Sequence, residues 1–183
     1  GFWALDSLSS LLSAGGWSRQ GGCSVARAKR DSNEYILVRP EQYMNLSGEA
    51  AAPVLRYFKI PFSNSVVIHD DLDLPIGAVR LKSGGGTGGH KGLDDLERHF
   101  SSRDFYRVRI GIGHPRDLQR LDGTPINKPH ADVTNWVLGA PKGEQLKALE
   151  TASELAAKAV IAIFEEGFTA AQQRFHVVAP QSF

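Results

Sequence analysis

Hydrophobic residues along this chain alternate between two spacings, one typical of helices and one typical of strands. Apolar residues at helical spacing predict helices, which we place at residues 2–12, 48–59, 92–100, 143–166 and 169–175, with a helical turn at 132–138. Alternating or continuous apolar runs predict strands, which we place at residues 23–29, 35–38, 65–69, 78–82 and 105–112. Strands interleaved with helices are typical of an α/β fold. We therefore predict a single globular α/β domain with a mixed, largely parallel sheet flanked by helices.

Small and turn-forming residues set the expected boundaries of these elements. Gly15 and Gly16 follow the first helix in the position of a C-cap, and Gly167 follows the long helix in the same way. Ser47 stands where an N-cap would open the second helix. Residues 118–130 contain glycine and proline and lack any periodicity, so we expect a long surface loop there, either mobile or acting as a lid.

The composition fits one cytoplasmic domain. Of the 183 residues, 42% are hydrophobic and 22% are charged, which allows the chain to bury one sizeable core. No apolar run approaches the ~18 residues that a membrane span needs, and the first residues do not read as a signal peptide. The single cysteine, Cys23, excludes an internal disulfide and a cysteine-rich zinc site, so we expect it to pack as a small hydrophobic residue of a strand.

The net charge of +1 does not by itself indicate a nucleic-acid partner, because attraction of phosphate requires positive charge gathered on one face. Basic residues do cluster locally, in three groups: Arg27, Lys29 and Arg30; Arg80, Lys82 and Lys91; and Arg103, Arg107 and Arg109. Arg107 and Arg109 alternate within one predicted strand and should point to the same face. Each group alone fits either a solvated surface or a phosphate contact.

Candidate chemistry follows the predicted strand at residues 65–69. The apolar run stops at His69, Asp70, Asp71 and Asp73, and open α/β sheets bind ligands at such carboxyl ends of strands. Three carboxylates could hold Mg²⁺, but alternation along the strand would place Asp70 opposite to Asp71 and Asp73. A single buried carboxylate that orients a catalytic histidine fits Asp70 better. Capping or turn roles fit Asp71 and Asp73.

A glycine-rich segment at residues 84–89, here named the glycine loop, leads directly to His90. It satisfies the dinucleotide-binding motif G-x-G-x-x-G trivially, and the next strand carries Arg107 and Arg109 where that motif requires an acidic residue. The Walker A motif fails, because His90 and Lys91 replace its lysine and hydroxyl residue. We interpret the loop as a flexible wall that positions His90.

Four segments resemble the bacterial-type peptidyl-tRNA hydrolase family, in the right order and at compatible spacing. They are EQYMNLSGEA, VVIHDDLDLPIGAVRLKSGGGTGGHKGL, FYRVRIGIGHP and NWVLG, and the resemblance covers nearly the whole chain. It implies a monomeric α/β globule around a mixed sheet. It also implies an esterase that cleaves the bond between a peptide and the 3′ ribose of its tRNA, with no metal or other cofactor and no membrane partner.

The resemblance assigns roles to residues near the predicted cleft. Asp70 resembles the carboxylate that orients and stabilises the family's catalytic histidine, and His90 resembles the histidine at the cleft wall. Asn45 on local grounds fits an Asx turn or a cap, but the resemblance makes it the amide that binds substrate near the scissile ester. Tyr43 matches the aromatic position that lines the tRNA end.

Basic residues match positions on the tRNA side. Lys82 and Arg109 resemble the family's phosphate-clamping residues, and such contacts position a nucleic acid without reading its bases. Lys91 departs from the family, which usually has asparagine after the histidine. Because lysine cannot accept a hydrogen bond, we expect Lys91 to hold the peptide differently.

The largest departure from the family lies at the start of the chain. Family members begin with a strand, a G-L-G-N-P-G loop and an R-H-N-x-G motif, whose last glycine aligns with Gly1. The general-base histidine and an upstream asparagine are therefore not in the printed sequence, and we expect an amino-terminally truncated domain with an opened core. Two alternatives to the hydrolase stay open: a non-catalytic RNA-binding relative, and a metal-dependent phosphohydrolase that uses Asp70, Asp71 and Asp73.

Overall fold

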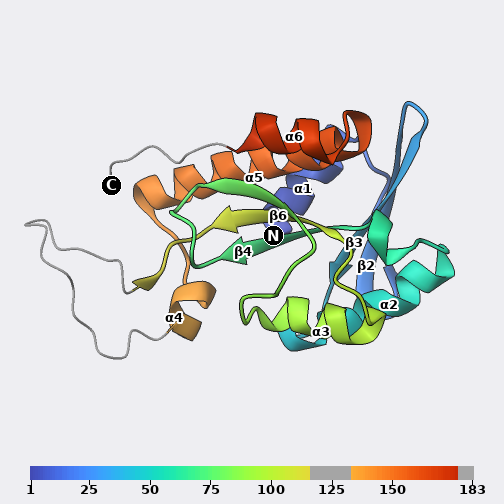
Figure 1. Cartoon of the computed structure of the whole chain (residues 1–183), viewed down its shortest axis with the longest axis horizontal. Helices are drawn as coiled ribbons and strands as arrows, with labels where there is room; N and C mark the ends of the chain where they lie inside the picture. The colour runs from blue at the N-terminus through green and yellow to red at the C-terminus, as the bar shows by residue number, and fades with distance from the viewer. Residues whose placement is uncertain (116–132, 177–183) are drawn as a thin grey trace, which may run out of the picture.

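Two three-stranded sheets form the framework of this protein, whose computed structural model describes residues 1–115 and 133–176 (Figure 1). The first sheet has the order β1-β2-β3 and is antiparallel, with β1 at Ser18–Gln20, β2 at Cys23–Arg30 and β3 at Asn33–Pro40. A turn at Asp31 and Ser32 joins β2 to β3, and Asp31 takes a left-handed conformation there (φ 52°). A connection this short forces the two strands to pair antiparallel.

The second sheet is mixed and has the order β4-β6-β5. β4 (Val66–Asp71) runs parallel to β6 (Tyr106–Gly111), whereas β5 (Val79–Ser83) runs antiparallel to β6. Of the four strand pairings in the described residues, only β4 with β6 is parallel. The predicted α/β domain with mixed pairing is confirmed, but its largely parallel character is wrong. Interleaved helices do not reveal strand direction. In the first sheet, tight turns impose the antiparallel pairs, whereas β5 and β6 pair antiparallel although α3 lies between them in the chain.

Helices cover the second sheet and also pack on strands of the first sheet (Figure 1). α1 (Phe2–Leu11), α5 (Gly143–Glu165) and α6 (Phe168–Phe175) pack with the apolar face of β5 and β6 in the main core. α2 (Ser47–Tyr57) and α3 (Lys91–Phe100) pack on each other and, through Val38 and Val67, on β3 and β4. α4 (Val133–Leu138) begins directly after the gap in the described residues, at 116–132. None of the described helices combines the length and apolarity needed to cross a membrane.

The predicted helices and strands are present with boundaries shifted by a few residues, and β1 is an addition. The C-cap assigned to Gly15 and Gly16 is wrong, because α1 ends at Leu11 and Ser13 supplies the left-handed residue (φ 49°). Gly15 instead donates its N–H to the carbonyl of Arg27 in β2 at 2.9 Å. Gly167 does end the long helix with a positive φ of 87°. The loop predicted at residues 118–130 lies outside the described residues.

The N-cap assigned to Ser47 is also wrong, because Asp95 of α3 caps α2 from a distance in sequence. Its Oδ2 accepts the N–H groups of Gly48 at 2.8 Å and Glu49 at 3.0 Å, while the Ser47 hydroxyl donates to the carbonyl of Met44. Burial raises the pKa of Asp95, but these N–H groups, together with the charges of His99 and Arg98, outweigh burial and hold that pKa below its ordinary value. A side chain on Gly48 would lie 2.2 Å from the Asp95 carbonyl oxygen, so glycine is required there. The cap fixes the start of α2 against α3.

Cys23 is fully buried in β2, as predicted for a small hydrophobic strand residue. Burial, and to a lesser degree Glu41, raises the pKa of its thiol to about 11. The thiol is therefore protonated near neutral pH and poorly reactive.

The two sheets leave an opening between them. Among the described residues, β3 pairs only with β2 and β4 only with β6, so each strand keeps one edge without a strand partner. A cavity of about 620 Å³ lies between these edges, and we name it the inter-sheet groove; its mostly apolar lining includes Leu8, Tyr35, Leu37, Val66 and Ile68. Within the described part of the chain, the hydroxyl of Tyr35 is buried without a hydrogen-bond partner.

Candidate active site

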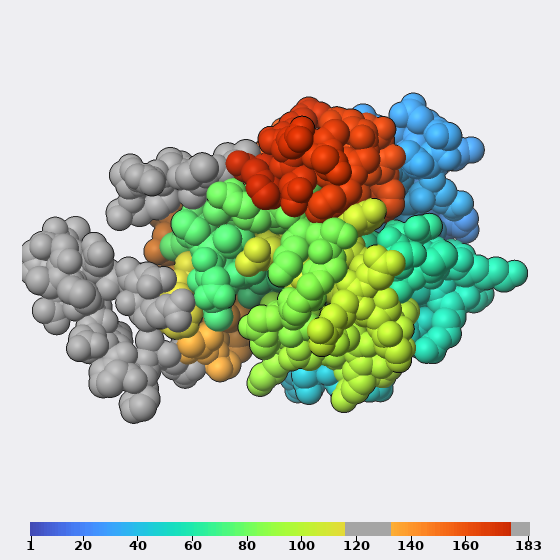
Figure 2. Space-filling model, in the orientation of Figure 1, coloured from blue at the N-terminus to red at the C-terminus, as the bar shows by residue number. Residues whose placement is uncertain are grey.

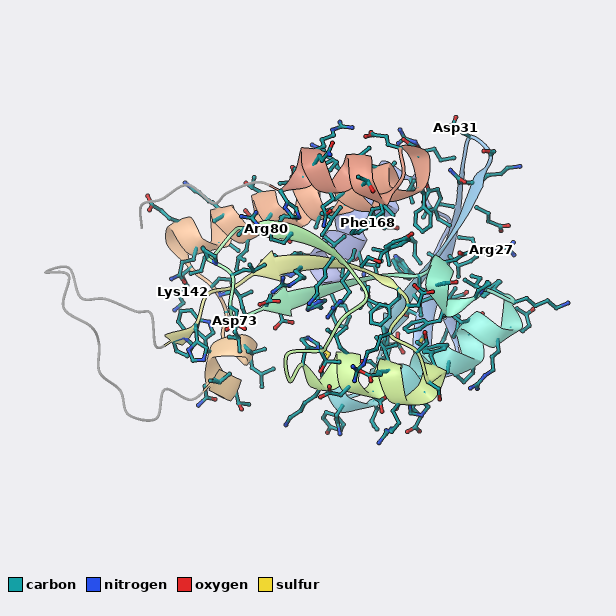
Figure 3. The ribbon with its side chains drawn as sticks, in the orientation of Figure 1. Arg27, Asp31, Asp73, Arg80, Lys142 and Phe168 are labelled. Atoms are coloured by element: carbon teal, nitrogen blue, oxygen red, sulfur yellow. The ribbon has the colours of Figure 1, made fainter. Side chains whose placement is uncertain are left out.

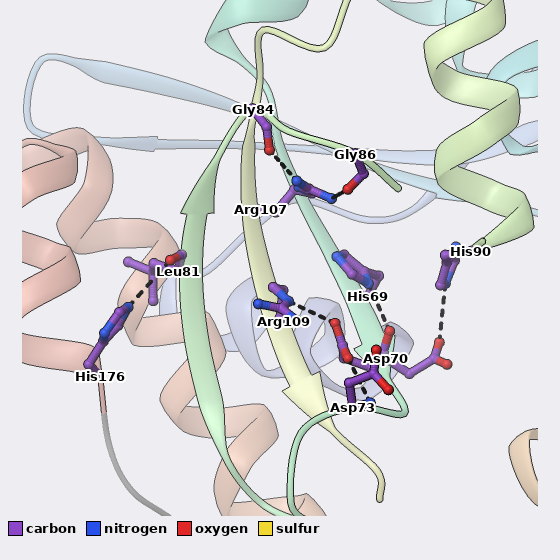
Figure 4. Close-up of polar contacts among 11 residues, drawn as sticks. His69, Asp70, Asp73, Leu81, Gly84, Gly86, His90, Arg107, Arg109 and His176 are labelled. Carbon is purple, nitrogen blue, oxygen red and sulfur yellow. Dashed lines mark hydrogen bonds and ion pairs between the residues drawn. The ribbon is translucent and has the colours of Figure 1, made fainter. Parts of the chain in front are cut away.

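Asp70 and His90 meet where β4 ends and α3 begins. Nε2 of His90 lies 3.5 Å from Oδ1 of Asp70, and both side chains are mostly buried (Figure 4). His90 is the N-cap residue of α3, and its Nδ1 accepts a hydrogen bond of 3.3 Å from the backbone N–H of Leu93. Because that N–H can only donate, Nδ1 is unprotonated and the ring carries its proton on Nε2, facing the carboxylate. Both ring nitrogens are thus engaged, and neither offers a free lone pair to a water molecule.

Asp70 is held as an anion. Burial raises its pKa, but hydrogen bonds from His90 and from the backbone N–H of Asp70, together with nearby positive charge that includes the amino terminus, outweigh burial, so the pKa of Asp70 lies below its ordinary value. Its side chain lines both the inter-sheet groove and a second cavity of about 370 Å³ beside Trp136. A carboxylate in this position can orient an imidazole and stabilise its protonated form.

His69, the residue before Asp70, is buried and neutral. It is 6% exposed, and its Nδ1 lies 2.7 Å from the backbone carbonyl oxygen of Asp70, so Nδ1 carries the proton. Nε2 is therefore an acceptor, and no described residue donates to it. Burial lowers the pKa of His69 to about 4, although the carbonyl of Asp70 opposes this. An imidazole with so low a pKa is a weak base near neutral pH.

Four basic residues share one face of the second sheet. The register pairs Arg80 of β5 with Arg109 of β6, and Lys82 with Arg107, so the predicted common face of Arg107 and Arg109 is confirmed. On this side of the molecule, β5 and the glycine loop, both green in Figure 2, occupy the surface between α6 and α3. The sheet therefore gathers the local positive charge that phosphate binding requires.

Asp71 lies on the same face and partly neutralises it. Its Oδ2 accepts a hydrogen bond of 2.7 Å from Nε of Arg109, and its Oδ1 accepts the N–H of Asp73 at 3.0 Å (Figure 4). The turn role predicted for Asp71 is thus confirmed. Arg27 belongs to a different surface, because the β2–β3 hairpin that carries it lies far from Arg80 and Asp73 (Figure 3).

The substrate-binding residues expected from the resemblance lie around the start of α3. Asn45 lies on a 3-10 turn, Met44–Leu46, and is exposed, without a hydrogen bond to any described residue. This turn packs on α3, where a side chain on Gly92 would lie 2.7 Å from the sulfur of Met44. Tyr43, 82% exposed, precedes the turn, and Lys91 is the exposed first residue of α3. The structure thus places Asn45, Tyr43 and Lys91 on segments that border His90.

The family of this chain follows from comparison with known proteins. The family model described as Peptidyl-tRNA hydrolase matches residues 1–182. The chain belongs to this family. A peptidyl-tRNA hydrolase of Polynucleobacter asymbioticus is 41% identical over 155 residues, covering 84% of this chain and 76% of that protein. Another, of Polynucleobacter necessarius subsp. necessarius, is 38% identical over 170 residues, covering 92% and 83%.

Solved structures of peptidyl-tRNA hydrolases share the fold. One, in complex with N-propanol, has a TM-score of 0.84 at 28% identity, covering 98% of this chain and 86% of that chain. Another, from Acinetobacter baumannii, has a TM-score of 0.82 at 27% identity, covering 97% and 84%. These matches give no support to the alternative of a non-catalytic RNA-binding relative.

The carboxylates of the metal-dependent alternative do not converge. Asp70 faces His90 at the end of β4, whereas Asp71 binds Arg109 on the opposite face of the sheet. In residues 1–115 and 133–176, no group of three or more His, Cys, Asp or Glu side chains is placed to hold a metal ion.

Three features of this peptidyl-tRNA hydrolase site were not predicted from the sequence. They are the capping role of His90, the burial of His69, and the contacts of Arg107 with the glycine loop. A histidine immediately before a helix is a usable N-cap signal, because its ring nitrogen can accept an N–H of the first turn. The other two depend on packing between distant segments.

Lowering the pH should destabilise this protein through His69. In the unfolded chain His69 titrates near its ordinary pKa of 6.5, but in the folded protein its pKa is about 4. Between these values only the unfolded state binds the proton, so the free energy of unfolding should fall by about 3 kcal/mol as the pH drops across this window. Chemical unfolding at a series of pH values measures the slope.

The matched control is His69→Asn, whose side-chain amide can still donate to the carbonyl of Asp70 but does not titrate. This variant should lose most of the slope between about pH 6.5 and pH 4. Equal slopes in the two proteins would show that His69 is not buried as described. Asp70 and Asp95, whose pKa values are lowered, add their own loss of stability only at still lower pH.

Proposed function

We propose that this protein hydrolyses the ester bond between the peptide and the 3′ ribose of peptidyl-tRNA and releases free tRNA for reuse in translation. The observation that carries the proposal is the pairing of the anionic Asp70 with His90 at the carboxyl end of β4, in a sheet whose opposite face gathers four basic residues. We also propose that the enzyme acts as a cytoplasmic monomer without metal or other cofactor. The direct test is the release of free tRNA from peptidyl-tRNA.

In this mechanism a histidine activates a water molecule that attacks the ester carbonyl. Asp70 orients that histidine and stabilises its protonated form, while His90 forms the wall of the cleft. The exposed amide of Asn45 binds the substrate near the scissile ester and stabilises the oxyanion. Tyr43 lines the tRNA end, and Lys91 contacts the peptide side.

The general base of this reaction must come from outside the two histidines at the site. His90 uses both ring nitrogens, and His69 is a weak, buried base. We therefore propose that residues 1–183 form an amino-terminally truncated domain, and that an additional strand in the inter-sheet groove delivers the base histidine to Asp70. The open edges of β3 and β4 and the apolar lining support this, because a strand placed there would find backbone partners on both sides.

Binding of tRNA should depend on Lys82 and Arg109. Replacing Lys82 with alanine should weaken affinity and lower the slope of log affinity against log salt by about 0.7 to 0.9, because one phosphate contact is lost. Arg109→Ala should weaken binding further, since it also leaves the carboxylate of Asp71 without its partner. Affinities measured at several salt concentrations give both quantities.

The matched control is Asp71→Asn, which frees the guanidinium of Arg109 and should leave tRNA affinity unchanged or stronger. Salt slopes that stay the same in both Lys82→Ala and Arg109→Ala would remove these residues from the phosphate contact. Hydrolysis by otherwise unchanged enzyme would then still support the proposed reaction, so the two claims can fail separately.

A further inference from the structure

Arg107 is a buried cation at the base of the glycine loop. The residue is only 2% exposed, although it belongs to the basic face of β6. Its Nη1 donates to the carbonyl oxygen of Gly86 at 2.9 Å, and its Nη2 donates to that of Gly84 (Figure 4). Within the described residues no carboxylate forms an ion pair with this guanidinium. Its fixed partners are thus two loop carbonyls and not a counter-ion.

The contacts continue without a break from Arg107 to the Asp70–His90 pair. Directly after Gly86, a turn closes with a hydrogen bond of 3.2 Å from the N–H of His90 to the carbonyl of Thr87. His90 then caps α3 and places Nε2 beside Asp70. Every residue between the anchored carbonyl of Gly86 and the histidine therefore belongs to one turn.

We propose that Arg107 is a positioning residue, which fixes the glycine loop by its two hydrogen bonds to Gly84 and Gly86 and so holds His90 at Asp70. Its importance for hydrolysis rests on the proposed function, but its effect on the loop does not. Six residues of glycine and threonine have little packing of their own, so a backbone anchor is the means by which this loop can keep one conformation.

The chemistry of arginine suits this role. A planar guanidinium presents several donors in a fixed fork, so it can bind two carbonyls at once, whereas a lysine ammonium acts from a single point. Gly84 and Gly85 adopt positive φ angles of 58° and 81° between the anchored carbonyls. The positive φ of Gly85 favours glycine there, and a side chain at this position would lie 2.8 Å from Cε of Lys82 and displace the end of that lysine.

The test compares Arg107→Met with Arg107→Lys in the 183-residue protein. Methionine fills a similar volume without donors, and the carbonyls of Gly84 and Gly86 can turn to water, so the overall melting temperature should change little. Hydrogen exchange of backbone amides in residues 84–93 should become about tenfold faster or more. In the parent protein, local opening of the loop must first break the two hydrogen bonds of Arg107, and in the variant it need not. Arg107→Lys should be intermediate.

Arg174→Met is the matched control, since it removes one arginine and one ion pair, with Glu166, from the exposed surface of α6. Its exchange in residues 84–93 should equal that of the parent protein. Unchanged exchange of this segment in Arg107→Met would overturn the proposal. Faster exchange spread evenly over the second sheet, with a lower melting temperature, would also overturn it and assign Arg107 a purely structural role.

A second measurement separates positioning from direct binding of phosphate. Because Arg107 is almost inaccessible, Arg107→Met should keep the salt slope of tRNA binding, in contrast to Lys82→Ala. A slope reduced by about 0.7 to 0.9 would make Arg107 a phosphate ligand instead.

In the hydrolytically active enzyme, the same variant should lower kcat about ten- to a hundredfold with little change in KM, since the loop is misplaced while tRNA contacts persist. A higher KM at unchanged kcat would contradict the proposal.

Discussion

The 183 residues as printed should hydrolyse peptidyl-tRNA at least about 100-fold more slowly than a version extended by the family's amino-terminal strand, loop and histidine. The reason is the state of the two histidines at the site. His90 has no free lone pair, and His69 is buried with a pKa of about 4. A positioned general base contributes about 10² to 10⁴ in rate, and neither imidazole can supply it. Release of free tRNA, measured for both polypeptides at equal concentration, gives the result.

A third version separates catalysis from folding. It carries the same extension with alanine in place of the added histidine, and it should regain stability but not activity. The strand would fill the inter-sheet groove and pair with the open edges of β3 and β4, whereas only the imidazole provides the base. Thermal melts of the three versions measure the first effect. Robust turnover by the unextended chain would place the base elsewhere, and His90 and His69 would be the first residues to replace.

Replacing Asp70 with asparagine should have the second largest effect, a loss of about 10² to 10⁴ in kcat in the extended version. An amide can donate to the histidine and so favour the wrong tautomer, and it cannot stabilise the protonated ring. Asp71→Asn is the matched control. Its amide oxygen can still accept the N–H of Asp73, and only the ion pair with Arg109 is lost, so kcat should fall by about tenfold or less.

Steady-state kinetics with peptidyl-tRNA distinguish these two variants from a metal site. Similar losses of kcat in Asp70→Asn and Asp71→Asn, or recovery of activity on addition of Mg²⁺, would support the metal-dependent alternative. A selective loss in Asp70→Asn without recovery supports orientation of a histidine.

The N-cap of α2 differs between the sequence prediction and the structure. The sequence pattern placed the start of α2 correctly, but it assigned the cap to Ser47 because that residue type is common at the position. In the structure Asp95 is the capping residue. It accepts the N–H of Gly48, although it lies 47 positions after Gly48 in the chain. A local pattern cannot detect a cap supplied by another helix.

The local sequence also could not predict which ionisable residues are buried. Strand alternation correctly placed Arg107 and Arg109 on one face. It could not show that Arg107 is buried under the glycine loop while Arg109 reaches Asp71, because that difference depends on which segment covers each position.

The sequence by itself determined the helices and strands, the α/β class and the family, because these depend on periodicity and on contiguous motifs. It also identified Asp70 at the end of a strand and His90 at the end of the glycine loop. Only the tertiary structure decided which atoms meet: the pairing of Asp70 with His90, the tautomer of each histidine, the separation of the two sheets, and the anchoring of the loop by Arg107. These contacts join segments that are distant along the chain, and hydrogen-bond direction and burial are fixed only when those segments pack together.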